Sequence, residues 1–404
     1  MRISTSEFIA LMAMLVATVA ISIDAMLPAL PDIAAELAPN NPNKVQFILS
    51  TFIIGLAFGT LIVGPLSDSF GRKNILYFGA TIYVLFSAVC VFATDLETMI
   101  FARVCQGIGA SAPRIVSQAL IRDLYSGREM ARISSFVMMI FSIVPALAPL
   151  LGAGMISVFD WRAIFIVFII FALISTIWTG FRVKEPLTPD RIVPFQLEVF
   201  KLAFLEIISL GIVRTAIVTL IFCYASLFTC IMLVQQVFDQ FFDRADSFPQ
   251  WFAIVAGLSA SASLLNSLVV MRLGMRRLIS GALLVQLVFS VLMLILLDAG
   301  IISGEMGFGI FVFWIFSLFF QAGMTIGNLT ALAMEPLGHI AGTGASVISA
   351  LATLGSAVIA AVAGQFFDGT PLAMIISVVL LSSMGSFSAH RLKRFERIKS
   401  SKKI

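Results

Sequence analysis

Four charged side chains lie well inside long apolar stretches of the sequence, five or more residues from either end: Asp24, Arg103, Arg114 and Arg214. A charge near the middle of a bilayer costs about 2.5–3.5 kcal/mol on insertion scales, so such residues usually face a cavity or an ionic partner. A carboxylate can accept and release a proton, and a guanidinium can hold a carboxylate or phosphate through two hydrogen bonds. These residue types therefore predict proton exchange and ligand binding within a membrane.

Asp24 and Arg103 are the predicted proton-coupling residues. Asp24 lies about 16 residues, or roughly 24 Å, into its apolar stretch, and Arg103 lies about five residues into a stretch that begins on the opposite side. We therefore expect both in the outer part of the membrane, where a substrate that competes for Arg103 would change the protonation of Asp24. Two alternatives stay open: a purely structural ion pair, or an Asp24 that merely reaches the membrane interface.

Arg114 and Gln106 extend this predicted site along one helix face. Arg114 follows Arg103 by eleven residues, about three turns and 20°, and Gln106 follows it at i+3. Arg214 adds a third positive charge from a later stretch. Three arginines against one aspartate predict a net positive cavity, which favours an anionic or zwitterionic substrate. The alternative for Arg114 and Arg214 is a bond to backbone carbonyls or a side chain that snorkels to the interface.

Gln321 and Asn328 are further predicted substrate-binding residues. They lie seven residues apart in one apolar stretch and therefore share a helix face. Hydrogen bonds between helices explain them equally well. The four cysteines all lie in apolar stretches, and the sequence has only two histidines, so neither a metal site nor a disulfide framework is predicted.

The elements that position these residues are predicted to be membrane-spanning helices, because 60% of the 404 residues are hydrophobic and only 12% are charged. A soluble domain has about 25% charged residues, and the mean hydropathy here is +1.05. A span needs about 20 apolar residues. Windows of that length predict an all-α membrane protein with twelve transmembrane helices near 8–30, 45–66, 75–93, 98–120, 133–158, 163–181, 205–234, 248–271, 278–297, 307–334, 341–367 and 371–389.

The basic residues predict the orientation of these spans. Loops on one side of the membrane carry twenty lysines and arginines, and loops on the other side carry three. The positive-inside rule then places both termini in the cytoplasm. The basic tail at 390–404 is interpreted as a cytoplasmic retention charge or as a contact with anionic lipid headgroups.

A polar stretch that carries three prolines divides the chain into two six-helix halves. The predicted organisation is an N-terminal half at 1–181, a cytoplasmic linker at 182–204, a C-terminal half at 205–389 and the tail at 390–404. Gly71 and Gly274 occupy equivalent loops of the two halves, and a basic pair follows each. This repeat indicates duplication into parallel halves, with convergence of two positive-inside loops as the alternative.

Several motifs resemble those of the major facilitator superfamily. Residues 64–73 (GPLSDSFGRK) are similar to its signature loop, with Ser69 where a basic residue usually stands, and 103–107 (RVCQG) resemble its Arg-x-x-Gln-Gly motif. Residues 148–152 (APLLG) resemble its fifth-span antiporter motif, with Ala148 in place of a glycine. Together with 26–31, 122–125, 160–165 and 333–343, the pattern is similar to the Bcr/CflA drug-resistance transporters. The resemblance implies the major facilitator fold and a proton-coupled exporter of the bacterial inner membrane.

The resemblance also implies that the loop at 64–73 locks the outward-facing state through charge pairs. The residues with a predicted gating role are Asp68, Gly71, Arg72, Arg122, Asp123 and Glu335. For Glu335, an ordinary helix cap and turn is the alternative. Pro145, Pro149 and Gly152 are predicted to kink the fifth span, because proline removes a backbone hydrogen bond.

Three functions compete on this basis. The favoured one is proton-coupled export of drugs or metabolites by alternating access, and the second is metabolite uptake by symport on the same fold. The third is a membrane receptor or enzyme, but the sequence shows neither a catalytic constellation nor a sizeable soluble domain. We therefore expect a monomer in the lipid bilayer with a small-molecule substrate, no nucleic-acid partner, no enzyme activity and no cofactor beyond the proton as coupling ion.

Overall fold

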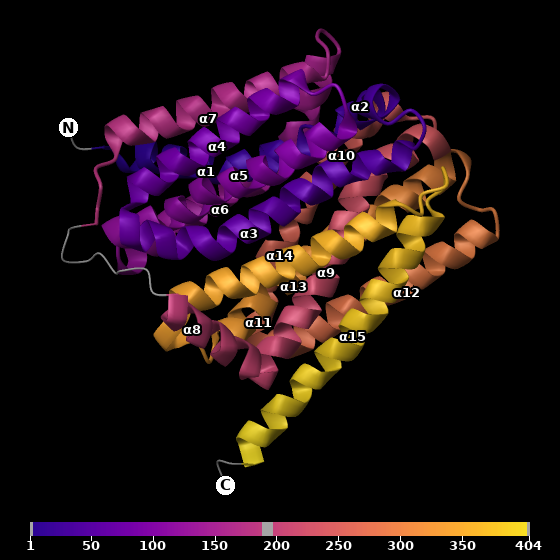
Figure 1. Cartoon of the computed structure of the whole chain (residues 1–404). Helices are drawn as coiled ribbons and strands as arrows, with labels where there is room; N and C mark the ends of the chain where they lie inside the picture. Colours follow the sequence, from indigo (N-terminus) through magenta and orange to yellow (C-terminus); the bar gives the residue numbers. More distant parts are fainter. Residues whose placement is uncertain (1–2, 188–196, 402–404) are drawn as a thin grey trace. The chain divides into compact units, whose positions relative to one another are not determined.

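The apolar stretches form long helices in a computed structural model, which describes residues 3–187 and 197–401 (Figure 1). Within these ranges the secondary structure is helical, with short connecting turns and no strand. In hydrocarbon a backbone amide must find its partner within its own segment, and a helix supplies that partner. The predicted all-helical fold is therefore confirmed for the described residues.

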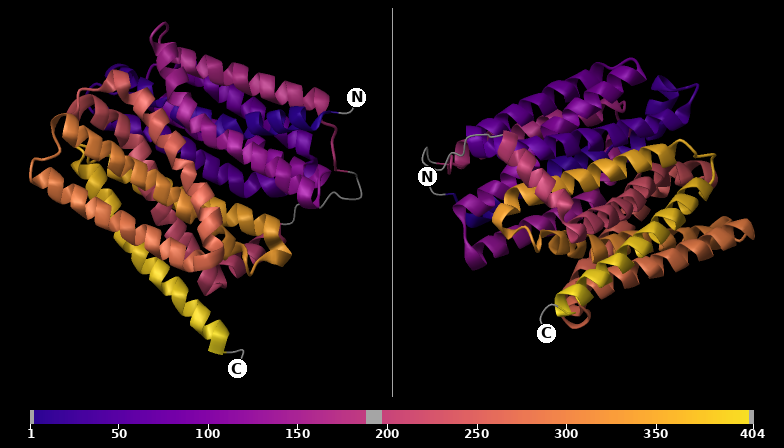
Figure 2. Two further views of the ribbon diagram at one scale, coloured as in Figure 1. Left: turned by 180° about the vertical axis from the view of Figure 1, so that it is seen from behind. Right: turned by 60° about the horizontal axis from the view of Figure 1, so that its bottom comes forward.

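The chain divides into two compact units, Met1–Leu197 and Glu198–Ile404. Within the first unit, long helices run alongside one another in every view (Figures 1 and 2). Its helices are α1 (Thr5–Asp24), α2 (Leu30–Leu37), α3 (Gln46–Phe70), α4 (Arg72–Phe92), α5 (Leu96–Leu124), α6 (Gly127–Ile156) and α7 (Arg162–Arg182). The exact domain limits given above, with a linker at 182–204, stay a prediction.

The second unit begins with a helix where the sequence predicted a linker. Its helices are α8 (Leu197–Ser209), α9 (Gly211–Gln236), α10 (Phe248–Ser259), α11 (Ser261–Leu273), α12 (Met275–Asp298), α13 (Gly304–Met334), α14 (Ala341–Gly364) and α15 (Leu372–Ser401). The chain leaves helical geometry at Leu210, with φ −74° and ψ 111°, so the seventh predicted span starts at α9 rather than at residue 205.

Eleven helical segments of the described chain are long and apolar enough to cross a membrane. The predicted fourth span, α5, is not among them although it is 29 residues long. Its polar content explains this, because Arg103, Gln106, Arg114 and Gln118 all lie within it. Length alone would let α5 cross a bilayer, since about 20 residues suffice.

The first predicted span, expected as one helix over 8–30, is broken. Helix α1 ends at Asp24, a short 3-10 turn occupies Leu27–Ala29, and α2 begins at Leu30. Pro28 and Pro31 lie at the starts of these two elements, where a missing N–H and a fixed φ are tolerated but would interrupt a continuing helix. The break directly follows the carboxylate that the sequence singled out.

Helix α5 is held in the first unit by close backbone packing, although it is the most polar of the long helices of that unit. It packs mainly against α3 and α4 and also contacts α1. A Cβ added at Gly107 would lie 2.1 Å from the carbonyl oxygen of Phe52 in α3. Because glycine has no Cβ, the two helices can pack this closely, and close packing is the main attraction between helices in lipid.

The N-termini of α5 and α13 are capped differently. Asp95 Oδ1 accepts a bond from the Thr98 N–H at 2.7 Å, and its Oδ2 accepts one from the Thr98 hydroxyl at 2.8 Å. These bonds favour the ionised carboxylate and hold the pKa of Asp95 below its usual 3.8. Ser303, at the corresponding start of α13, makes no side-chain capping bond.

Two glycine turns join consecutive helices in the same way. Gly71 connects α3 to α4 with φ +93° and ψ 146°, and Gly274 connects α11 to α12 with φ +78° and ψ 151°. Side chains other than hydrogen are strongly disfavoured in this backbone region. The two turns that the sequence aligned therefore have one backbone conformation.

Candidate functional site

Asp24 lies at the last residue of α1 and its side chain is only 5% exposed. Among the described residues it has no hydrogen-bond or ion-pair partner. An ionised carboxylate that is buried without a partner is costly. A proton or a positively charged ligand group would relieve that cost, so the position suits reversible proton binding.

The antiporter-like segment of α6 packs against the break that follows Asp24. A Cβ added at Gly152 would lie 2.0 Å from the carbonyl oxygen of Ala25, so only glycine fits there without displacing one of the two helices. Helix α6 continues through Pro145 and Pro149 as an α-helix, and the predicted kink at these residues stays a prediction. The contact places the motif one residue from the buried carboxylate.

Arg103 is fully buried in α5, with 0% of its surface exposed. Its Nε donates to the Ile48 carbonyl at 3.1 Å, Nη2 donates to the Ser22 carbonyl at 3.0 Å, and Nη1 donates to Gln106 Oε1 at 2.5 Å. The guanidinium also lies over the ring of Phe52, 4.3 Å from its centroid. Arg103 therefore ties α5 to α1 and α3 through neutral groups.

Arg103 does not pair with Asp24 in this structure, and the proton-coupling role predicted for the two residues stays a prediction. The guanidinium reaches α1 at the Ser22 carbonyl, two residues before Asp24, and its other bonds go to α3 and to Gln106. Backbone carbonyls and an amide have taken the place of the carboxylate. The two residues lie in neighbouring parts of the first unit, but their charges do not pair.

A polar network extends from Arg103 into α4. Gln106 is also fully buried, and its Nε2 donates a hydrogen bond to Ser87 Oγ of α4 at 2.6 Å. The hydroxyls of Ser22 and Tyr83 are 2.6 Å apart. Each of these side chains has a partner, as buried polar groups require. Gln106 therefore positions Arg103, and its predicted contact with substrate stays a prediction.

The other two arginines are in different surroundings. Arg114 is half-buried on α5 and has no ion pair among the described residues. Arg214 is exposed near the start of α9 and lines a pocket with Arg391 of α15, within the second unit. The predicted cluster of three arginines around one cavity is therefore not formed by side chains of a single unit.

The two predicted amide residues of α13 bond to neighbouring side chains. Asn328 Nδ2 donates to Asn266 Oδ1 of α11 at 2.6 Å, which is the interhelical bond left open as the alternative. Gln321 Nε2 donates to Thr325 Oγ1 at 2.8 Å. Gln321 also lines a pocket of about 370 Å³ between α12 and α13, beside Phe320 and other aromatic side chains.

Arg72 is the centre of the glycine turn in the first unit and is only 4% exposed. It pairs with Asp68 at 2.5 Å and with Asp123 at 2.8 Å, and it donates to Ser67 Oγ at 2.7 Å. All these partners belong to the first unit, so the contacts fix the turn against α5. The lock between conformational states that was expected of them stays a prediction.

Glu185, which the sequence did not single out, caps the start of α4. Its Oε1 accepts the N–H of Arg72 at 3.1 Å and its Oε2 accepts the N–H of Lys73 at 2.8 Å. Gly71 at the helix N-cap has no side chain to do this, and the first N–H groups of a helix need outside acceptors. That missing cap was a usable signal for some acceptor, although not for its position in the chain.

The remaining gating candidates lie in exposed positions. Arg122 is 57% exposed and its Nε is 3.9 Å from Asp123 Oδ1, a distance at which an exposed pair contributes little. Glu335 caps the exposed C-terminus of α13. In the turn that follows, His339 Nε2 lies 2.8 Å from Glu206 Oε1 of α8.

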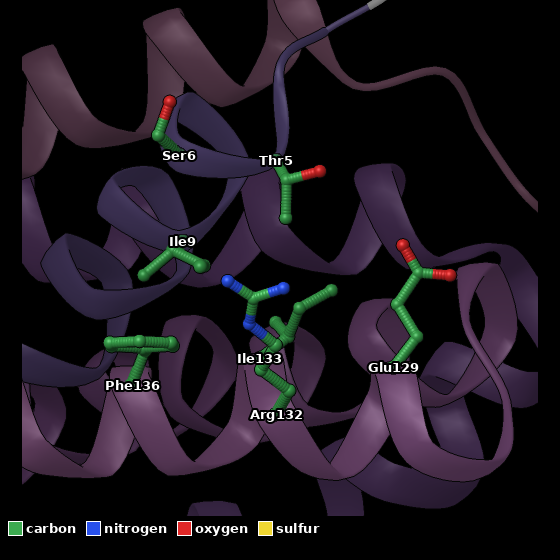
Figure 3. A pocket seen from close by; sticks show the side chains of 7 residues that line it. All are labelled: Thr5, Ser6, Ile9, Glu129, Arg132, Ile133 and Phe136. Atoms are coloured by element: carbon green, nitrogen blue, oxygen red, sulfur yellow. The ribbon is translucent and has the colours of Figure 1, made fainter.

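A pocket of about 490 Å³ lies between the starts of α1 and α6 (Figure 3). Arg132 extends its guanidinium into it, between Ile9 and Glu129, and Thr5 faces the same space. The Arg132 guanidinium also lies 5.9 Å from the ring centroid of Phe136. In the part of the chain that the structure describes, no group of three or more His, Cys, Asp or Glu residues is placed to hold a metal.

Known proteins resemble this chain over most of its length. A sequence model of the Major Facilitator Superfamily matches residues 11–360. The bicyclomycin resistance protein homolog of Haemophilus influenzae is 28% identical over 351 residues, 86% of each chain. Multidrug resistance protein MdtL of Vibrio parahaemolyticus is 26% identical over 376 residues, 91% of this chain and 90% of that protein. A solved D-xylose-proton symporter has a TM-score of 0.77 at 16% identity, over 96% of this chain and 97% of its own, which shows the fold alone.

Proposed function

This chain belongs to the Major Facilitator Superfamily of secondary transporters, and on that premise we propose that it exports small molecules in exchange for protons. The resemblance to Bcr/CflA-type transporters is confirmed by relatives named for bicyclomycin and multidrug resistance. Those names support export of drug-like compounds by alternating access. The chain is accordingly a multi-pass membrane protein with a small-molecule substrate.

The proposed topology has twelve spans in two six-helix halves, with both termini in the cytoplasm. Eleven segments qualify as spans by length and composition, and α5, 29 residues long and packed against α3 and α4, is proposed as the twelfth. The distribution of basic residues supports the orientation. We propose a monomer in the bacterial inner membrane that uses protons as coupling ion, with no cofactor, no nucleic-acid partner and no enzyme activity.

The observation that carries proton coupling is the buried, unpartnered Asp24 at the break between α1 and α2. Proton binding neutralises it, and movement of α6 against the break through Gly152 would change its surroundings. One proton moving inward supplies about 2.3 kcal/mol per 100 mV of membrane potential. That is roughly a fifty-fold concentration ratio, which is sufficient for export.

The same observation changes the expected substrate charge. Arg103 donates its hydrogen bonds to neutral groups, and Arg214 lines a pocket of the second unit with Arg391, so these two arginines give no direct support to an anion site. An unpartnered Asp24 instead favours a substrate with a positively charged group, cationic or zwitterionic. Exchange then follows because proton and substrate both neutralise one carboxylate.

Everted membrane vesicles with an acidic interior test this proposal. Bicyclomycin, ethidium as a cation, carboxyfluorescein as an anion and a zwitterionic amino acid serve as probes. An exporter accumulates its substrate inside such vesicles, and collapse of the pH gradient stops the accumulation. Asp24→Asn should abolish gradient-driven accumulation and weaken binding of the cationic substrate, because the proton and the substrate use the same carboxylate.

Asp32→Asn is the matched control, because Asp32 lies on α2 of the same segment but is exposed. It should transport as the wild type does. Full pH-driven transport by Asp24→Asn would overturn the proton assignment. Loss of substrate from preloaded vesicles under the same gradient would show uptake by symport instead, and accumulation of the anion alone would restore the positive-cavity argument based on Arg114.

A further inference from the structure

A second pocket of the C-terminal unit, about 540 Å³ in volume, lies between α9 and α15. Two arginines line it, Arg214 from the first turn of α9 and Arg391 from α15. Val218, Met384 and Phe387 supply much of its apolar wall. None of the lining residues is acidic, so the pocket combines two positive charges with an apolar surface.

The two arginines lie at the same end of their helices. Arg214 is the fourth residue of α9, and Arg391 lies one residue before the end of the apolar segment Leu372–Leu392. Ser388 joins these ends, because Thr219 Oγ1 donates to Ser388 Oγ at 2.8 Å and Ser388 Oγ donates to the Thr215 carbonyl at 3.4 Å. The charges therefore lie at one membrane interface, and the apolar wall extends from them toward the middle of the span.

Both arginines are available to a ligand. Each is exposed, and neither has an ion pair among the described residues. Arg391 instead lies over the ring of Phe387, with its guanidinium carbon 4.7 Å from the ring centroid. The apolar wall is exposed as well, since Phe387 is 64% and Met384 50% accessible. A lone inorganic anion would leave this wall uncovered.

We propose that this pocket binds an anionic phospholipid, with the phosphate on Arg214 and Arg391 and the acyl chains along Val218, Met384 and Phe387. Guanidinium groups match phosphate oxygens geometrically, and basic pockets between transmembrane helices bind acidic headgroups. In the orientation proposed above the lipid comes from the cytoplasmic leaflet. Arg214 then serves lipid binding rather than the substrate path.

Native mass spectrometry of the full-length purified protein tests the proposal directly. Detergent-solubilised protein is mixed with phosphatidylglycerol, phosphatidylcholine or soluble glycerol phosphate, and bound adducts are counted. The wild type should retain phosphatidylglycerol in preference to phosphatidylcholine and should not retain glycerol phosphate. The double variant Arg214→Gln/Arg391→Gln should bind phosphatidylglycerol about tenfold more weakly, since a hydrogen bond to a charged group contributes that much or more.

Two further variants separate a built pocket from general attraction to a basic protein. Val218→Trp keeps both arginines but fills the exposed wall, and it should lose the preference for phosphatidylglycerol. Arg128→Gln/Arg132→Gln removes two exposed arginines from α6 and should retain that preference. Equal loss in this control, retention by Val218→Trp, or binding of glycerol phosphate as strong as that of the lipid would overturn the proposal.

The mass-spectrometric assay measures lipid binding without transport. A negative result for the lipid site is therefore distinct from a negative result for the proposed export. A protein that binds phosphatidylglycerol through Arg214 and Arg391 but shows no proton-driven accumulation would refute only the export function. The reverse result would refute only the lipid site.

Discussion

The glycine turns of the two units share a backbone but not a set of contacts. At Gly71 the following residue, Arg72, is buried among Ser67, Asp68 and Asp123, and Glu185 caps the next helix. At Gly274 a Cβ would meet nothing within 4 Å, and the residue that follows is Met275. The two turns share the backbone that requires glycine, but a buried arginine follows the glycine only at Gly71, since Met275 follows Gly274.

The largest effect should come from Arg72→Ala. This change leaves Asp123 and Asp68 without their cation, and loss of one partner from a buried pair costs about 3–5 kcal/mol. We expect about 3 kcal/mol because Asp68 is 45% exposed. Thermal unfolding of the purified protein measures the loss, with Met275→Ala in the second turn as a control that should cost far less. Equal losses would remove the difference between the two turns.

Alanine at each glycine tests what the turns have in common. Gly71→Ala and Gly274→Ala should each destabilise the protein by about 1–3 kcal/mol, because both impose a backbone region that is nearly restricted to glycine. The same thermal assay compares them. A loss at Gly71 alone would mean that contacts around the first turn, rather than its φ and ψ, require the glycine.

Glu185→Gln should have a smaller effect. The amide keeps one oxygen for a backbone N–H of α4 but places an NH₂ group against the other, and a lost charge-assisted bond costs about 1.5–3 kcal/mol. Partial compensation by water at this edge should keep the loss near the lower limit. Hydrogen exchange of the first turn of α4 should accelerate. Unchanged exchange there would show that Glu185 does not cap the helix.

The smallest effect should distinguish the caps of α5 and α13. Asp95→Ala should destabilise the protein slightly above pH 4, whereas Ser303→Ala should not, since Ser303 makes no capping bond. The pKa of folded Asp95 is below 3.8, so its contribution is complete above the unfolded pKa and disappears as the pH falls through the lower folded value. Unfolding midpoints of Asp95→Ala and wild type should therefore converge in acid.

The sequence predicted the helices, the glycine turns and the residues that carry charge into the apolar segments, because hydropathy, period and proline act locally. It singled out Asp24 and Arg103 among those residues. It did not predict their partners, since helical spacing gives the depth of a residue but not the rotation of one helix against another. The carbonyls of Ser22 and Ile48 that bind Arg103 cannot be distinguished in sequence from any other carbonyl.

The long-range contacts of the Gly71 turn could not be predicted from the sequence either. Glu185 binds the N–H groups of Arg72 and Lys73 across more than a hundred residues of sequence. A backbone N–H group is the same in nearly every residue type, so the sequence around it does not indicate which side chain will accept its hydrogen bond. The break after α1 was not predicted, although Pro28 and Pro31 are a local signal for it.

The burial of Arg103 has a consequence for how the protein is made. Helix α5 would enter a bilayer poorly by itself, but the groups that solvate its guanidinium come from α1 and α3, and both are synthesised before it. The nascent chain therefore offers those carbonyls by the time α5 leaves the ribosome. In the proposed twelve-span topology, α5 therefore enters the membrane together with the earlier helices that solvate its guanidinium.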